Sequence, residues 1–157
     1  MKNNKLCPYI ITLGVSLLTI FFFWHIPFID TLSGYVMLAL WRTNAWGAMA
    51  TLFQTFIMID LVVLTVIGIL GIFKESGRFQ TNLNLFSISF ISLCIFACLS
   101  FIEFVFIIAL SSSININFGI GSIIQTIASV VALCMFKLGN KQEKTADAKQ
   151  KTKKSEI

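Results

Sequence analysis

Four long runs of apolar residues limit what this chain can fold into. They cover residues 9–29, 46–73, 83–110 and 118–138. A helix that crosses a bilayer needs about 20 consecutive, mostly apolar residues, so each run is long enough to form one. Because 57% of the residues are hydrophobic and only 12% are charged, a soluble domain of this size has no interior large enough for them. We therefore expect an all-α integral membrane four-helix bundle.

The first run has a second interpretation, a secretory signal peptide. Lys2 and Lys5 precede it, as in the basic start of such a peptide. A signal peptide has an apolar core of about 7–15 residues, followed by a cleavage site of small residues. The run here is longer, and no such site follows it. We therefore expect residues 9–29 to be retained as a membrane span.

Basic residues are distributed unevenly around the four runs. The segments outside the runs are residues 1–8, 74–82 and 139–157 on one side and 30–45 and 111–117 on the other. With Lys137 included, the first side carries eleven Lys and Arg residues, whereas the second carries only Arg42. Cytoplasmic segments of membrane proteins are enriched in Lys and Arg. Both termini are therefore expected in the cytoplasm, with the protein in a plasma membrane or bacterial inner membrane.

The first outer loop contains an apolar segment, residues 34–41, that is too short to span a bilayer. It is either an interfacial or re-entrant piece across the outer mouth of the bundle, or an extension of a tilted second span. Aromatic residues near the outer boundary favour this placement, because their rings prefer the headgroup layer. These residues are Trp24, Tyr35, Trp41 and Trp46.

Asp60 lies near the middle of the second run. Residues 51–71 contain thirteen Leu, Ile, Phe or Val residues. These favour insertion by about 4–8 kcal/mol, against a cost of about 2.5–3.5 kcal/mol for one central Asp, so the span inserts. No Lys or Arg within the spans lies at this depth. Three interpretations stay open: a protonated Asp bonded within the bundle, an ion or proton carrier, and an acid paired with a basic residue of another subunit.

Four further polar residues are predicted to share one layer in the outer half of the bilayer. Their distances from the span ends agree within about 6 Å when each helical residue rises about 1.5 Å. They are His25, Gln54, Glu103 and Gln125. One interpretation is a proton or cation site in which His25 tunes Glu103. The other is that these side chains are hydrogen-bonding contacts between helices.

Helical spacing also predicts which faces turn inward. One stripe of the third span carries Ser89, Ser92, Ser100 and Glu103, and the opposite side carries Ser87, Cys94 and Cys98. A helix in lipid turns its polar stripe toward other helices or a wet cavity, so Glu103 should face the interior. In the second span, Gly68 and Gly71 are one turn apart, a spacing that lets helices approach closely.

Motifs of known catalytic and metal sites are absent from the sequence. It contains a single His and no P-loop, zinc-protease or serine-hydrolase motif. Cys94 and Cys98 are one turn apart, but two thiols without a further ligand make a poor metal site. We therefore expect neither enzyme activity nor a cofactor nor a metal.

Residues 139–157 are rich in Lys, Gln, Thr and Ala and poor in apolar residues. Such a segment cannot bury enough surface to fold by itself, so a disordered basic cytoplasmic tail is expected. Its lysines either dock onto anionic lipid or an acidic partner, or only anchor the topology. No aromatic residue interleaves with them, which argues against nucleic acid. The candidate lysines are Lys141, Lys144, Lys149, Lys151, Lys153 and Lys154.

Three functions fit this sequence. The preferred one is a non-enzymatic accessory or assembly subunit of a larger membrane complex, because the chain is small and Asp60 lacks a basic partner within it. The second is an oligomeric small transporter or channel with Asp60 or Glu103 as its proton or cation site. The third is a membrane-embedded immunity or regulatory protein that binds one partner in the bilayer. The expected partners are the lipid bilayer and other membrane subunits or further copies of the chain.

Overall fold

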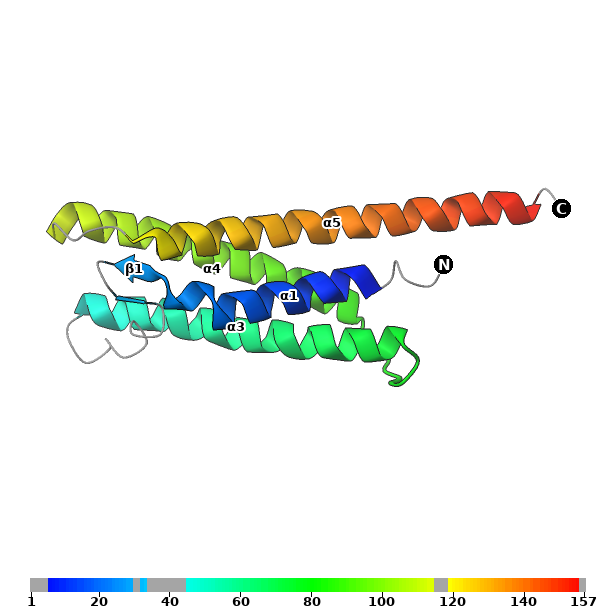
Figure 1. The fold of residues 1–157 in the computed structure, drawn as a ribbon, viewed down its shortest axis with the longest axis horizontal. Helices are drawn as coiled ribbons and strands as arrows, with labels where there is room; N and C mark the ends of the chain where they lie inside the picture. The colour runs from blue at the N-terminus through cyan, green and yellow to red at the C-terminus, as the bar shows by residue number, and fades with distance from the viewer. Residues whose placement is uncertain (1–5, 30–31, 34–44, 115–118, 156–157) are drawn as a thin grey trace.

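The computed structural model describes residues 6–29, 32–33, 45–114 and 119–155, with the backbone alone at 29, 32, 45–47, 110–114 and 139–155. Its long helices, drawn in Figure 1, are α1 (Cys7–Phe21), α3 (Ala45–Glu75), α4 (Leu85–Ile114) and α5 (Ile120–Ser155). Among these described residues, four stretches are long and apolar enough to cross a membrane: Cys7–His25, Ala48–Glu75, Leu85–Ala109 and Ile120–Leu138. The expected all-helical protein with four candidate spans is confirmed.

The four helices form a bundle in which each helix has two main neighbours. α1 and α4 each pack against both α3 and α5, with fewer contacts across the diagonal between α1 and α4. The predicted close approach at Gly68 and Gly71 is confirmed, because a Cβ there would lie 2.9 Å from Leu13 and 2.1 Å from the ring of Tyr9. α1 therefore lies directly against the glycine face of α3.

The bundle exposes apolar side chains and buries polar ones. Phe22, Phe56 and Phe101 are each more than half exposed, whereas Gln54 and Gln125 are fully buried. Hydrocarbon solvates apolar side chains, and polar groups inside a membrane need partners within the protein. This distribution is typical of a bundle that has lipid around it.

The first span ends earlier than the predicted residues 9–29. A 3-10 turn, η2 (Phe23–His25), follows α1, and strand β1 (Pro27–Ile29) then pairs antiparallel with β2 (Leu32–Ser33). Pro27 has no N–H to donate and disfavours helical backbone at the residue before it, and Ile26 is indeed extended. The chain therefore leaves the helix before the predicted end.

Two glycines at the start of α5 let β1 lie directly against that helix. A Cβ on Gly119 would lie 2.4 Å from the carbonyl oxygen of Pro27, and one on Gly121 would lie 2.5 Å from the ring of Phe28. The N–H of Gly119 donates to the carbonyl of Phe28 over 2.9 Å. Phe28 is fully buried, so this contact holds β1 and the preceding η2 turn against α5.

The turn between α3 and α4 has well-defined ends. Gly77 has a φ of 74°, and the N–H groups of Gly77 and Arg78 donate to the carbonyls of Lys74 and Phe73. This is the Schellman arrangement, which needs a left-handed residue and therefore favours glycine. The side chain of Asn84 accepts the N–H of Ser87 over 3.2 Å and caps the start of α4.

Two helices extend past the predicted spans. α4 continues to Ile114, into the predicted loop 111–117, and α5 continues to Ser155, through most of residues 139–157. A helix that has already formed adds residues without a new nucleation cost, and Lys, Gln and Ala favour helix. The backbone of 139–155 is therefore helical where the composition predicted disorder. Figure 1 shows this part of α5 running beyond the other helices.

The structure describes only some of the four aromatic residues predicted at the outer boundary. The segment 34–41, with Tyr35 and Trp41, lies outside the described residues, as does the side chain of Trp46. Trp24 is fully buried, so the prediction that its ring faces the headgroup layer is wrong. Its indole finds a hydrogen-bond acceptor inside the bundle instead, which removes its need for an interfacial position.

Candidate intramembrane sites

Glu103 on α4 lies at the centre of a buried side-chain network. Gln54 on α3 donates from Nε2 to Oε1 of Glu103, and Gln125 on α5 donates from Nε2 to Oε2 over 2.8 Å. Trp24 in η2 donates from Nε1 to Oε1 of Gln125 over 2.8 Å. All four side chains are 0% exposed. This group, the Glu103 network, joins every long helix except α1 and reaches α1 through the adjoining η2.

Trp24 determines which way the amide of Gln125 points. Because Oε1 of Gln125 accepts the indole N–H, its Nε2 must face Glu103, and the carboxyl oxygen there must accept. Gln54 has no such restraint, since its Oε1 has no hydrogen-bond partner among the described residues. If the Gln54 amide turned over, Oε1 would face Glu103 and could accept a hydrogen bond from its protonated carboxyl group. The network can therefore supply hydrogen-bond partners to Glu103 in both its ionised and its protonated form.

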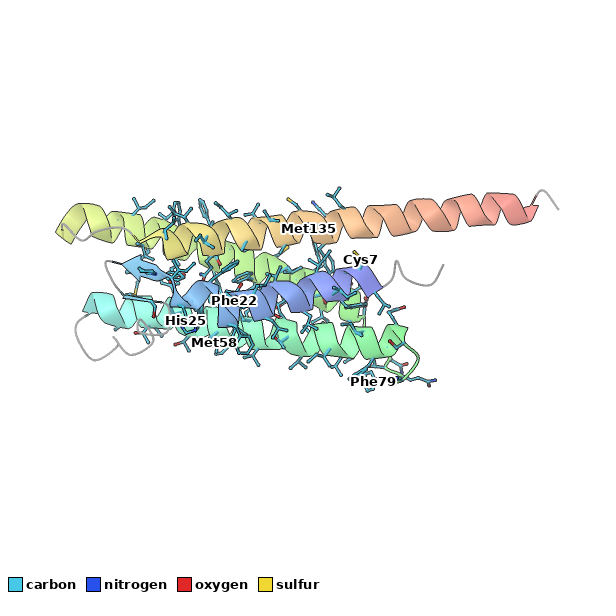
Figure 2. The ribbon with its side chains drawn as sticks, viewed as in Figure 1. Cys7, Phe22, His25, Met58, Phe79 and Met135 are labelled. Atoms are coloured by element: carbon cyan, nitrogen blue, oxygen red, sulfur yellow. The ribbon has the colours of Figure 1, made fainter. Side chains whose placement is uncertain are left out.

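Three of the four residues predicted for the outer polar layer come together. Gln54, Glu103 and Gln125 join the network, whereas His25 is exposed and does not. Figure 2 places His25 near the β1 end of the bundle. Because α1 ends at Phe21 and η2 is wound more tightly, a regular helix predicts the wrong residue to point inward. Trp24 takes the inner position.

The predicted inward stripe of α4 is confirmed. Its members Ser89, Ser92, Ser100 and Glu103 are buried, whereas Ser87 and Cys98 are exposed and Cys94 is half-buried. The hydroxyl of Thr126 donates to the backbone carbonyl of Ser100 over 3.2 Å. Oγ of Ser100 has no hydrogen-bond partner in the part of the chain that the structure describes. Ser100 thus faces α5 without joining the Glu103 network.

Asp60 on α3 forms a second, separate polar site. Its Oδ1 accepts a hydrogen bond from the hydroxyl of Ser92 on α4. Asp60 is only 8% exposed, yet its Oδ2 has no hydrogen-bond partner within the described ranges. As a carboxylate oxygen Oδ2 lacks a donor, and in the protonated acid it lacks an acceptor if it carries the proton and a donor if Oδ1 carries it. Neither protonation state is satisfied by the residues around it.

An open groove between α3 and α4, with a volume of about 610 Å³, leads to Asp60. It is lined by Phe56, Ile59 and Val63 from α3 and by Ile88, Ile91, Ile95 and Leu99 from α4, with Asp60 and Ser92 between them. The walls are exposed, for example Phe56 at 55% and Ile91 at 58%, whereas Ser92 is only 4% exposed. Asp60 and Ser92 therefore lie at the bottom of an open apolar groove, which we call the α3–α4 groove.

Two of the contacts at these sites were not predicted from the sequence. Ser92 was placed on the inner stripe, but its pairing with Asp60 depends on the register between α3 and α4, which hydropathy does not give. Sequence position predicts the headgroup layer for Trp24, because Trp is common there. A buried tryptophan needs an acceptor, and Gln125 at a similar predicted depth was the available signal.

The tail lysines named above follow Leu138 on the helical backbone of α5, and their side chains lie outside the described residues. Their binding to lipid or to a partner stays a prediction. Among the described residues, no group of three or more His, Cys, Asp or Glu side chains could hold a metal.

Comparison of the chain with protein-family models, with curated proteins and with solved structures found no match. The Glu103 network and the α3–α4 groove are therefore the features from which a function can be inferred. They differ in one respect: the network is closed, and the groove is open to the outside of the bundle.

Proposed function

We propose that this chain is a non-enzymatic accessory or assembly subunit of a larger membrane complex, and that the α3–α4 groove receives a helix of a partner. The observation that carries the proposal is the carboxyl group of Asp60, a residue that lines the groove and whose buried Oδ2 has no hydrogen-bond partner among the described residues. A polar group left unpaired in hydrocarbon is costly. A partner helix would cover the apolar walls and supply the missing hydrogen bond.

The proposed topology has both termini in the cytoplasm of a cell whose plasma or inner membrane holds the bundle. In Figure 1 the start of α1 and the end of α5 lie at the same end as the turn between α3 and α4. Lys74 and Arg78 lie at that turn, and eleven of the twelve Lys and Arg residues fall on this side. The positive-inside rule assigns such a side to the cytoplasm. The lysines of α5 can then meet anionic headgroups or an acidic partner.

A transporter or channel has less support. Its coupling site needs access to water, and the residues that line the groove are apolar apart from Asp60 and Ser92. Both carboxyl oxygens of Glu103 are engaged by Gln54 and Gln125 inside the bundle. An immunity or regulatory protein would use the same groove, and would differ from an assembly subunit in the identity of the partner.

A photo-crosslinking side chain in the groove tests the proposal. Replacing Ile91 by p-benzoylphenylalanine puts the crosslinker on the groove wall. The same replacement of Ile127 on α5 is a matched control, because the two side chains are 58% and 57% exposed. In native membranes, position 91 should give an adduct with one other membrane protein. Position 127 should not, and Asp60→Asn should remove the adduct.

The proposal is contradicted if position 91 gives only adducts between copies of this chain. It is also contradicted if the purified chain, reconstituted in vesicles, carries a proton or cation flux that Asp60→Asn abolishes. Both results would favour the oligomeric transporter instead.

A further inference from the structure

We infer that the helix received by the α3–α4 groove belongs to a different protein and carries a Lys or Arg at the middle of its span, where it pairs with Asp60. This inference rests on the proposed function and narrows the chemistry of the partner. It follows from the depth of Asp60, from the groups that surround it, and from the distribution of basic residues in the sequence.

Asp60 lies near the centre of its span. It is 12 residues from Ala48 and 15 residues from Glu75, the two ends of the candidate span. At about 1.5 Å per residue, these separations are about 18 and 22 Å along the helix. A partner group at the membrane surface is therefore too far away, and the group must be carried at mid-span.

The groups that the structure describes around Asp60 supply neither a hydrogen bond to Oδ2 nor a positive charge. Ser92 supplies a neutral donor to Oδ1, and the other groove residues on α3 and α4 are apolar and carry no charge. A neutral donor on a partner would bond Oδ2 but leave any negative charge unbalanced. A cation supplies both the hydrogen bond and the opposite charge, and the attraction is strong where the dielectric constant is low.

A second copy of this chain cannot supply that cation. The sequence has no Lys or Arg between Lys5 and Arg42, between Arg42 and Lys74, or between Arg78 and Lys137. Its four spans are therefore without a basic residue at mid-depth. A copy docked in the groove at the same depth would bring its own Asp60 and Ser92, neither of which carries a positive charge. The cation must therefore come from a different protein.

The length of the groove matches a short stretch of one helix. Its α3 wall runs from Phe56 to Val63 and its α4 wall from Ile88 to Leu99, which is about 10 and 16 Å. These lengths correspond to about two to three turns of a docked helix. Such a helix would place its basic residue beside Asp60, with apolar residues one turn to either side against the walls.

Designed helices test the inference. The purified full-length chain is reconstituted in phosphatidylcholine–phosphatidylglycerol vesicles with leucine-rich single-span helices that differ only in a central Lys, Asn or Leu. Binding is measured by energy transfer between labels on the chain and the helix. The Lys helix should bind about 5–30-fold more tightly than the Leu helix. Asp60→Asn should remove this preference, and moving the Lys by one turn should weaken it.

A second variant tests the contribution of the groove walls independently of Asp60. Ile91→Trp adds a large side chain to an exposed wall position and leaves Asp60 unchanged, so binding of the Lys helix should fall while the bundle stays folded. Equal binding of the Asn and Lys helices would overturn the inference, and so would self-association stronger than binding of the Lys helix. If either result came with a partner adduct at position 91, the inference would fail while the proposed function stood.

Discussion

Nε2 of Gln125 lies 2.8 Å from Oε2 of Glu103 and links α5 to α4 inside the bundle. Gln54 reaches the other oxygen of the same carboxyl group from α3, so one acid joins three helices. Hydrogen bonds between membrane helices contribute about 0.6 kcal/mol on average and up to about 2 kcal/mol. Glu103 is therefore expected to matter to stability as an acceptor of hydrogen bonds.

Removing that acceptor should destabilise the bundle, and replacing it with an amide should cost less. Glu103→Leu leaves the amide groups of Gln54 and Gln125 unpaired, and we expect it to lower the free energy of unfolding by about 1–3 kcal/mol. In Glu103→Gln, a new N–H can be accepted by Oε1 of Gln54 once that amide turns over. Unfolding in mixed detergent micelles measures both variants. Equal losses for the two would refute the proposed role of Gln54.

The indole of Trp24 should be coupled energetically to Gln125. Trp24→Phe keeps most of the ring but removes the N–H that Oε1 of Gln125 accepts. A double-mutant cycle with Gln125→Leu should give a coupling energy of about 0.5–1.5 kcal/mol. A second cycle that pairs Phe22→Leu with Gln125→Leu is the control for this coupling, because Phe22 is 65% exposed. A coupling energy of zero would mean that the hydrogen bond contributes nothing to stability.

The contact between β1 and α5 should not tolerate a side chain on Gly119. Gly119→Ala puts a Cβ 2.4 Å from the carbonyl oxygen of Pro27, and the backbone must move. We expect a loss of about 1–3 kcal/mol in the free energy of unfolding. Gly14→Ala is the matched control, because nothing lies within 4 Å of its added Cβ. That substitution should be neutral or stabilising by up to about 1 kcal/mol. The opposite order of effects would contradict the described contact.

The proposed orientation predicts which residues a reagent outside the cell can reach. In a variant without the natural cysteines, Ser76→Cys at the turn after α3 should react with an impermeant maleimide only after the membrane is opened. Ser33→Cys in β2, at the opposite end, should react in intact cells. The labelled fraction of each variant is read by gel shift. The reverse pattern would place both termini outside.

Hydropathy and helical spacing predicted the parts of this structure that depend on single helices. The bounds of the second span, residues 46–73, differ little from Ala45–Glu75, because a run of large apolar residues without proline has few other conformations in lipid. The burial of Ser89 and Glu103 also followed from spacing alone. Gln54 and Gln125 were placed beside Glu103 because antiparallel helices bring equal depths together.

The parts that depend on contacts between elements were not predictable in the same way. Trp24 points into the bundle where His25 was predicted, because a tighter turn begins at Phe23, only two residues before His25. The groove at Asp60 depends on how far apart α3 and α4 lie, which no property of either helix gives. The backbone of 139–155 is helical because it continues an existing helix, whereas composition alone describes the segment as if it had to form a helix by itself.

Exchanging the charge at position 60 with the charge at the centre of the docked helix tests the central claim most directly. The dissociation constants of the natural chain and of Asp60→Lys are measured against designed helices with a central Lys and a central Glu. If Asp60 is the polar anchor of the α3–α4 groove, the natural chain binds the Lys helix more tightly and the variant binds the Glu helix more tightly. The same order of affinity for both chains would contradict the claim that a partner helix is held through Asp60.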